Sequence, residues 1–497
     1  MSRSLSRVVG GLAASYVRPP VQSYTDACEA PVAMWNGAIT LRRVAQPSHG
    51  SAAVVKTYTH PPERHPNTLA FTDINTMYCI GNDELVQYFP EGVGGKVMQT
   101  FVPGHPRGFL YRKQSHLLRL FIEKIRFFDL KQEAIDSLTD GRPGLIFDGE
   151  TGTGKSALLC QAVHYARSNG IFTLYVPNAR VWTHGEWCWP STLLPGFFDV
   201  PDAARFFLQY FAAANRTVLS SWKLRKTPLD LPTDAGEKPP ATLLDLCEWG
   251  HRALAPASVD RQSVALKFVM DELKEESTMP MLFVVDGWNL FSHETHFRFP
   301  HPDFWRTMAS FQEANTDIDL YPQEMPRIPS SRLSFVRALN AMVLAKAAEP
   351  NGKQRNKFFV TCTTRDFKPF DGVSGFPDVE TDKHRSSLDE YAPYYPAKDS
   401  PFLPMAVENF DEYEYRSYLR FLVNSGELAG LGWGPLWHYS SPFERKLAKI
   451  DFMSDRNPQR VIDHYHQEIV WRHEYYRMRQ KQFITNTRNR RAVRGRE

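Results

Sequence analysis

The fold of this chain is decided by residues 149–156, which read Gly149-Glu150-Thr151-Gly152-Thr153-Gly154-Lys155-Ser156. This stretch matches the pattern G-x-x-x-x-G-K-S at every fixed position. The apolar run 144–147 precedes it, and residues 157–163 after it have the composition of a helix. A strand, a glycine-rich loop and a helix in this order separate a phosphate loop from a chance match. The stretch therefore predicts a nucleotide-binding α/β protein.

The residue types in the loop explain this chemistry. Glycines adopt backbone angles that other residues avoid, so the loop N–H groups and the helix N-terminus can point at phosphate oxygens. Lys155 adds a positive charge near the outer phosphates, and the Ser156 hydroxyl can ligate magnesium. The less specific alternative is a glycine-rich turn that binds nothing. The loop alone determines neither the base nor whether the nucleotide is hydrolysed.

A second element of the site is expected at residues 281–286, where an apolar run ends in Asp286. A buried strand with a carboxylate at its carboxyl end can hold magnesium together with Ser156, directly or through water. We therefore predict Ser156 and Asp286 as the metal ligands. Gly287 follows, where many ATP-hydrolysing proteins place the carboxylate that activates water. Glu150 and Glu294 are candidate substitutes without a spacing argument, so the catalytic residue stays unassigned.

Further apolar segments place the loop in a sheet. Buried strands are expected at residues 144–147, 171–176, 281–286 and 357–364. Helices are expected at residues 82–89, 114–128, 157–163, 258–276, 331–348 and 411–424. A strand, helix, strand order implies right-handed crossovers between parallel strands. The expected fold class is α/β, with a parallel sheet flanked by helices around the phosphate loop.

Three residues outside the loop join the predicted nucleotide site. Arg112 and Lys113 begin the helix ahead of the loop strand and can approach a base or phosphate, although surface charges at a helix start are the commoner explanation. Thr363 ends a strand where a phosphate-sensing side chain would lie, and a surface hydroxyl explains it equally well. The guanine-reading pattern N-K-x-D is absent. The predicted nucleotide-binding residues are Gly149, Glu150, Thr151, Gly152, Thr153, Gly154, Lys155, Ser156, Ala157, Arg112, Lys113 and Thr363.

Length and composition restrict the classes of protein that remain. A chain of 497 residues is expected to form about two or three domains. It has no apolar run of about 18 residues, so no membrane span is expected. Its six cysteines are scattered without a C-x-x-C pair, which fits a reduced intracellular protein better than a disulfide framework or a cysteine zinc site.

The first 25 residues resemble a mitochondrial transit peptide in composition. They contain Arg3, Arg7, Arg18 and several serines, and no acidic residue precedes Asp26. An ordinary disordered basic terminus is the alternative. The residues that follow are rich in proline and histidine up to about residue 70, and are expected to form an extended lead-in. The glycine run at residues 92–95 lacks the spacing of a phosphate loop and is expected to form a turn.

The last 27 residues, 471–497, hold eight arginines and one lysine against two glutamates. Tyr475, Tyr476 and Phe483 lie among these charges. Such a tail suits a nucleic-acid surface, and a solvated end is the alternative. The predicted domains are a targeting segment 1–25, an extension 26–108, a nucleotide-binding domain 109–400, a helical domain 401–470 and the basic tail 471–497.

An ordered set of short motifs extends beyond the phosphate loop, from about residue 73 to about residue 465. The set comprises Phe89-Pro90-Glu91-Gly92, Gln99-Thr100-Phe101 leading to Arg112-Lys113, Val176-Pro177-Asn178-Ala179 with Trp182, Val285-Asp286-Gly287 with Asn289, Val407-Glu408-Asn409-Phe410, and Asn457-Pro458. With this set the chain resembles the death-associated protein three family, the GTP-binding proteins of the mitochondrial ribosomal small subunit. The segment before residue 73, an insertion at 226–240 and the arginine tail depart from it.

The resemblance implies a P-loop NTPase core of the AAA-like kind with a smaller, helical, winged-helix-like C-terminal domain. It further implies bound GTP or GDP with Mg²⁺, ATP not being excluded, and a location on the mitochondrial ribosome in the matrix. The expected partners are small-subunit rRNA and ribosomal proteins, with no DNA.

Three classes of function remain after these observations. A structural nucleotide binder of the mitochondrial ribosome fits the missing carboxylate after Asp286 and the basic tail. An active ATPase or GTPase switch that is not bound to the ribosome would need a water-activating residue, which the sequence does not identify. A phosphotransferase would need an acceptor pocket, for which the sequence gives no sign.

Overall fold

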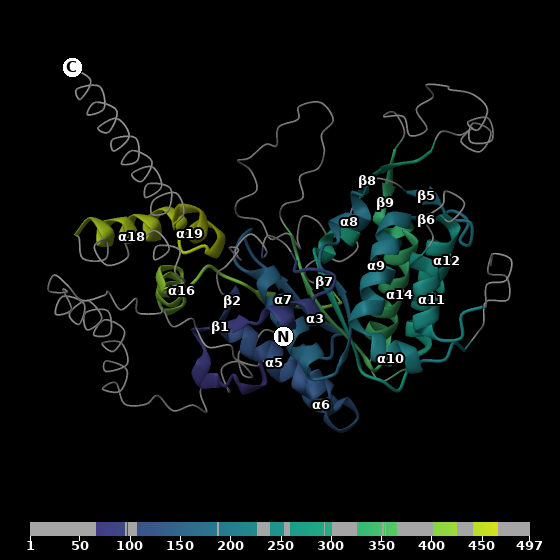
Figure 1. Cartoon of the computed structure of the whole chain (residues 1–497), viewed down its shortest axis with the longest axis horizontal. Coiled ribbons are helices and arrows are strands. Elements are labelled where there is room, and N and C mark those ends of the chain that lie inside the picture. Colours follow the sequence, from purple (N-terminus) through teal and green to yellow (C-terminus); the bar gives the residue numbers. More distant parts are fainter. Residues whose placement is uncertain are drawn as a thin grey trace, which may run out of the picture. The chain divides into compact units, whose positions relative to one another are not determined.

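The structure is a computed structural model of the chain (Figure 1). It describes residues 66–94, 97, 107–185, 188–225, 239–252, 259–292, 294–300, 326–349, 352, 354–364, 401–424 and 441–465. The chain divides into two compact units, Pro61–Ser417 and a second unit of Met1–His60 with Tyr418–Glu497. The predicted targeting segment and basic tail lie outside the described residues, and the predicted domain boundaries stay predictions.

A five-stranded sheet forms the centre of the larger unit, and all of its strands run parallel, as the sequence predicted. The strands in spatial order are β11 (Leu403–Ala406), β3 (Gly144–Asp148), β10 (Lys357–Cys362), β7 (Met281–Asp286) and β4 (Phe172–Val176). One strand, β10, therefore separates β3, which precedes the glycine-rich loop (residues 149–156), from β7, which ends in Asp286. Residues 403–406, placed by sequence in the C-terminal part, extend this sheet.

Helices cover both faces of the sheet, so the central strands are buried on each side (Figure 1). Successive residues of a strand point to opposite faces. Phe358 of β10 lies 6.3 Å from the rings of both Phe121 and Phe128 on one face. Phe359 points the other way and stacks on Phe283, with 4.9 Å between ring centroids. The result is a three-layer α/β/α arrangement.

The first helical layer consists of α5 (Lys113–Ile125), α6 (Phe128–Thr139) and α7 (Lys155–Ser168). α5 buries Leu118, Phe121, Ile122 and Ile125, which the helical period places on one side. The opposite layer consists of α9 (Pro201–Ala214), α10 (Arg216–Ser221), α11 (Leu243–His251), α12 (Val259–Glu275) and α14 (Ser334–Ala348), whose apolar residues share one core with that face of the sheet. The helices predicted at 258–276 and 331–348 are confirmed, whereas the helix predicted at 114–128 ends at Ile125, and α6 begins three residues later.

Short elements complete the larger unit. Three antiparallel pairs were not predicted: β1 (Thr76–Ile80) with β2 (Arg107–Tyr111), β5 (Trp189–Pro190) with β6 (Phe198–Asp199), and β8 (Glu294–Arg298) with β9 (Arg327–Pro329). The remaining short helices are η1 (Pro66–Thr68), η2 (Phe71–Asp73), α3 (Asn82–Tyr88), α8 (Arg180–Thr183), η4 (Trp288–Ser292) and η5 (Ser330–Arg332). The helix predicted at 82–89 is confirmed as α3.

Helix α16 (Glu412–Asn424) begins in the larger unit and ends in the smaller one, which also contains α18 (Ser441–Ser454) and α19 (Pro458–Tyr465). α18 and α19 pack together and bury Ile450 and Val461. The winged-helix form of this part stays a prediction. Within the described ranges, no helix has the length and apolar character that crossing a membrane requires.

Two lysines, Lys346 and Lys357, are buried at the end of the sheet where the strands begin. Lys346 of α14 is 3% exposed, and its Nζ donates a hydrogen bond to the Arg355 carbonyl and lies 3.8 Å from the centre of the Phe358 ring. Burial lowers the pKa of Lys346 from 10.5 to about 7; Asp136 raises this pKa and Lys357 lowers it further. Burial dominates because water solvates an ammonium ion far better than a protein interior does.

Stability of the larger unit is therefore expected to rise with pH between about 7 and 10. In this window the unfolded chain keeps the Lys346 proton while the folded chain releases it, so this residue raises the free energy of unfolding by up to about 1.4 kcal/mol per pH unit. Lys357, whose pKa burial lowers to about 8, adds to the slope in the upper part of the window. Replacing Lys346 by Met should flatten this part of the urea-midpoint profile. Lys267→Met, which removes a surface ammonium paired with Asp271, is the matched control. Equal slopes for wild type and Lys346→Met would contradict the assignment.

Candidate functional site

The glycine-rich loop connects the end of β3 to the start of α7. Gly152 and Gly154 have φ angles of +86° and +98°, in the left-handed region that residues with a side chain rarely adopt. The turn brings the chain round so that α7 begins at Lys155. A helix N-terminus carries N–H groups without partners inside the helix and a partial positive charge. The predicted strand, loop and helix are therefore all present.

Lys155 places its charge inside the loop. Its side chain is 7% exposed, and Nζ donates to the carbonyl oxygens of Gly149 and Glu150, at 2.7 Å each. The Thr153 hydroxyl donates to the same Glu150 carbonyl at 3.0 Å. Ser156 and Ala157, in the first turn of α7, are half-buried, and Thr151 is exposed at the loop tip. The loop thus surrounds a cation at a helix N-terminus, which is the chemistry that a polyphosphate requires.

Asp286 lies at the same edge of the sheet as the loop. In the parallel register it is level with Cys362 of β10, which in turn is level with Phe147 of β3. The Cys362 thiol donates to Asp286 Oδ1 at 3.0 Å. Burial and the charge of Asp286 raise the pKa of Cys362 well above its ordinary value, while the Lys155 ammonium lowers it. Lys155 therefore lies within electrostatic range of the thiol that contacts Asp286.

The metal chemistry of this edge fits magnesium held through a nucleotide. Across the described part of the chain, no cluster of three or more His, Cys, Asp or Glu side chains could hold a metal ion by itself. Magnesium in nucleotide sites keeps several water ligands and takes only one or two protein oxygens beside the phosphates. Ser156 at the start of α7 and Asp286 at the end of β7 satisfy that need. Their role as metal ligands stays a prediction.

Arg112 contacts the outside of the loop. The residue is 5% exposed, and its guanidinium donates from Nη1 to the Thr153 carbonyl at 2.9 Å and from Nη2 to the Glu408 carbonyl at 3.1 Å. Nε and Nη2 also donate to the two carboxylate oxygens of Glu414, each at 2.9 Å. Arg112 thus supports the loop, and its approach to a base or phosphate stays a prediction. Lys113, the next residue, is exposed.

Thr363 connects the strand ends. Its side chain is buried, and Oγ1 donates to Asp148 Oδ1 at 2.6 Å, directly before the loop. The neighbouring residue, Thr364, exchanges two hydrogen bonds of 2.8 Å with the Asn289 side chain, which follows β7. These contacts fix the carboxyl ends of β3, β10 and β7 relative to one another. Contact between Thr363 and a phosphate stays a prediction.

Gly287 explains why no glutamate follows Asp286. Its φ angle is +87°, and a Cβ built there would lie 3.3 Å from Thr364 Cγ2. A glutamate at this position would be strained in the backbone and crowded by its neighbour. Two other glutamates were suggested in place of the water-activating carboxylate. Glu150 lies in the loop and is half-buried, and Glu294 is exposed on β8. Neither has a contact that identifies it as a base.

Several residues at this edge were missed by sequence reasoning. Gly94 packs against Asp286 and donates its N–H to the Tyr175 hydroxyl at 2.9 Å. The sequence shows its glycine run and predicts only a turn there. Glu414 lies 302 residues from Arg112 in the sequence, so no local pattern indicates the pair. Cys362 lies in the strand expected at residues 357–364, but no sequence pattern indicates its contact with Asp286.

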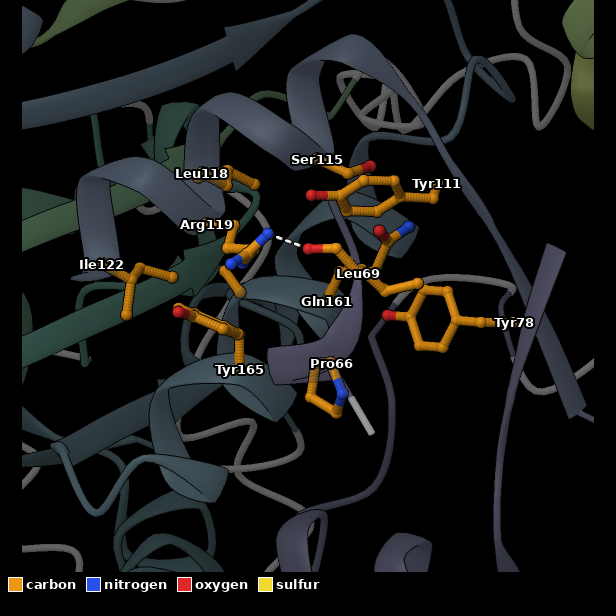
Figure 2. Close-up of a pocket in the computed structure, with 11 residues that line it drawn as sticks. Pro66, Leu69, Tyr78, Tyr111, Ser115, Leu118, Arg119, Ile122, Gln161 and Tyr165 are labelled. Atoms are coloured by element: carbon orange, nitrogen blue, oxygen red, sulfur yellow. Dashed lines mark hydrogen bonds between the residues drawn. The ribbon is translucent and has the colours of Figure 1, made fainter. Parts of the chain in front are cut away.

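A cavity of about 10 Å³ lies elsewhere, between the start of the described chain, β1, β2, α5 and α7 (Figure 2). Arg119 donates to the Leu69 carbonyl beside it, and the Gln161 amide, which donates to the Leu110 carbonyl, forms part of its wall. Such a volume accommodates about one water molecule. The cavity is therefore too small for a nucleotide.

Together the parallel sheet, the loop and Asp286 define an α/β protein with a P-loop-like core. The family model described as "Mitochondrial ribosomal death-associated protein 3" matches residues 135–304, which include the loop and Asp286. The chain is 21% identical over 421 residues to the small ribosomal subunit protein mS29 of Bos taurus, covering 83% of this chain and 88% of that protein. The protein of the same name from Mus musculus is 24% identical over 396 residues, covering 77% and 83%.

These comparisons confirm the resemblance to the mitochondrial ribosomal death-associated protein 3 family that the motifs of the chain indicated. The predicted mitochondrial location is confirmed by the same comparisons.

Replacing Lys155 by Ala is expected to weaken nucleotide binding at least about tenfold. The change removes a cation next to several phosphate charges, and a charge-assisted hydrogen bond contributes about 1.5–3 kcal/mol. A direct titration of the purified protein with GTP, GDP and ATP measures the effect. Lys113→Ala, which removes an exposed charge of the same type, is the control. Equal affinities of wild type and Lys155→Ala would reject the site.

Breaking the Arg112–Glu414 pair is expected to destabilise the protein. Replacing Arg112 by Met leaves a buried carboxylate without its bidentate partner, which costs about 3–5 kcal/mol. The double variant Arg112→Met with Glu414→Met removes both charges and should recover much of that loss. Urea unfolding of the four proteins in this double-mutant cycle gives the coupling energy. Additive effects would show that the two side chains do not stabilise each other.

Proposed function

We propose that this protein is a nucleotide-binding structural component of the small subunit of the mitochondrial ribosome, with GTP or GDP as the favoured ligand and ATP not excluded. The observation that carries this proposal is the glycine-rich loop at the carboxyl edge of the parallel sheet. Lys155 lies inside the loop, and Asp286 is level with the end of β3, the strand that precedes the loop. Ligands of open α/β sheets bind at this edge. The preference for guanine rests on the family resemblance.

The ribosomal role draws its support from relatives that are themselves named small ribosomal subunit proteins. Small-subunit rRNA and ribosomal proteins are the proposed partners, and the arginine-rich tail is the proposed source of phosphate contacts. The finer proposals for the fold are an AAA-like core and a winged-helix-like C-terminal part, the latter built around α16, α18 and α19.

A bound nucleotide would act mainly as structure. A ligand that binds only the folded state stabilises it by RT ln(1 + [L]/Kd), or about 2.7 kcal/mol at a hundredfold excess over Kd. The segment from Val407 to Glu414 runs along the outside of the loop and contacts it through Gly149 and Arg112. A nucleotide that fixes the loop would therefore also fix this segment.

Hydrolysis is expected to be absent or slower than about 0.01 s⁻¹, because Gly287 supplies no water-activating carboxylate and positioning alone gives only slow turnover. Phosphate release from GTP and from ATP by the purified protein is the measurement. Lys155→Ala is the control, since it removes the cation expected next to the phosphates, and a rate that this change leaves unaltered comes from contamination. Turnover of many nucleotides per second that Lys155→Ala abolishes would favour the alternative, an active switch.

Association with the small subunit tests the ribosomal role. Native protein should sediment with the small subunit in a gradient, and deletion of residues 471–497 should flatten the dependence of binding on salt. Each phosphate contact contributes about 0.7–0.9 to the slope of log K against log salt. A tail of equal length with its eight arginines changed to Gln is the matched control and should behave like the deletion. A protein that runs near the top of the gradient even at low salt would overturn the role, and an unchanged slope would show that the tail is only a solvated end.

A further inference from the structure

Asp286 lies between two groups that belong to neither the glycine-rich loop nor the apolar run of β7. Cys362 of β10 contacts it from one neighbouring strand. Gly94 approaches it from the side of β4, the other neighbouring strand of β7. Asp286, the only carboxylate of the two predicted metal ligands, is therefore held by residues 94 and 362, which lie far apart in the sequence.

The contact with Cys362 fixes one carboxylate oxygen. The Cys362 thiol donates from Sγ to Asp286 Oδ1 at 3.0 Å. The thiol is the donor because an ionised carboxylate can only accept hydrogen bonds. Cys362 is 0% exposed and Asp286 is 7% exposed, so little solvent competes for this bond. The two residues are opposite each other in the parallel register, which sets their separation through the backbone of β7 and β10.

The contact with Gly94 restricts the other oxygen. A Cβ at residue 94 would lie 2.6 Å from Asp286 Oδ2, 2.8 Å from Tyr175 Oη and 2.9 Å from the Pro177 carbonyl oxygen. Real Cβ atoms do not approach other atoms this closely, and the Pro177 carbonyl belongs to the backbone. The Gly94 N–H donates to Tyr175 Oη at 2.9 Å, which keeps the residue in place. Only glycine fits between Tyr175 and Asp286 in this arrangement.

We propose that Cys362 and Gly94 are positioning residues that set the direction in which the Asp286 carboxylate faces a magnesium ion bound with the nucleotide. The thiol fixes Oδ1, and the glycine backbone defines the space available to Oδ2. The inference rests on the proposed nucleotide site and adds to it two residues outside the glycine-rich loop. Their effect is exerted through Asp286, so it depends on magnesium and not on the nucleotide alone.

The test compares nucleotide affinity in Mg²⁺ and in EDTA for the full-length protein, with whichever of GTP, GDP and ATP binds wild type most tightly. Cys362→Ala should lose about fivefold in affinity in Mg²⁺, the effect of about one hydrogen bond, and nothing in EDTA. Cys362→Ser keeps a donor of similar reach and should retain most of the Mg²⁺-dependent affinity. Gly94→Ala should lose at least about tenfold in Mg²⁺, because overpacking displaces Asp286 or the backbone beside it.

Gly92→Asn is the matched control in the same segment. A Cβ at residue 92 meets no atom within 4 Å, and asparagine tolerates a φ angle of +84° better than other side chains. This variant should bind as wild type does in both conditions. Melting temperatures measured without nucleotide separate a folding defect from a binding defect. If Gly94→Ala does not fold, the comparison of Cys362→Ala with Cys362→Ser still tests the inference.

Three outcomes would overturn the inference. Cys362→Ala and Gly94→Ala could bind as wild type in Mg²⁺, which shows that Asp286 needs no such support. They could lose the same factor in EDTA as in Mg²⁺, which indicates a general packing role. Wild type could fail to bind any of the three nucleotides, which rejects the proposed function itself and this inference with it. The inference is rejected, and the proposed function is kept, if the wild type binds tightly, Lys155→Ala weakens that binding, and the variants at residues 94 and 362 bind as the wild type does.

Discussion

The central strands of the sheet are buried on both faces, and the rest of the structure depends on this constraint. Every residue of β7 and β10 is buried, so the charged group of β7 has its place at the last residue, Asp286. Buried strands satisfy their backbone groups in the ladder and exclude unpaired charges from the interior. Because all five strands run parallel, their carboxyl ends share one edge. Polar side chains and the glycine-rich loop therefore gather there, as ligand sites of open α/β sheets do.

The loop also depends on residues far away in the sequence. Gly149 packs against the Val407 carbonyl, where a Cβ would lie 2.2 Å from the oxygen. Glu408 and Glu414, in the same segment, accept hydrogen bonds from Arg112, which donates to the loop as well. Four donated bonds offset the cost of burying the Arg112 charge. The chain that follows β11 thus forms the outer wall of the loop.

Elements with a strong local signal were predicted from sequence, and those that depend on a distant partner were not. The apolar runs of β4, β7 and β10 and the periodic faces of α12 and α14 carry their signal within a few residues. β11 is not predicted because it is only four residues long and contains Pro404, a residue type that argues against a strand. β11 lies at the edge of the sheet, where the N–H group that proline lacks is not needed. β2 and β9 pair with strands across intervening chain, so only the folded structure reveals them.

The sequence by itself determined the loop, its helix, the strand that ends in Asp286 and the absence of a carboxylate after it, because each is a pattern of neighbouring residues. Only the tertiary structure decided the strand order that makes Asp286 level with Cys362, the Arg112–Glu414 pair and the approach of Gly94 to Asp286. Each of these joins residues that the chain separates widely. Their contacts follow from how the strands pair and the helices pack, and local spacing contains no information about that.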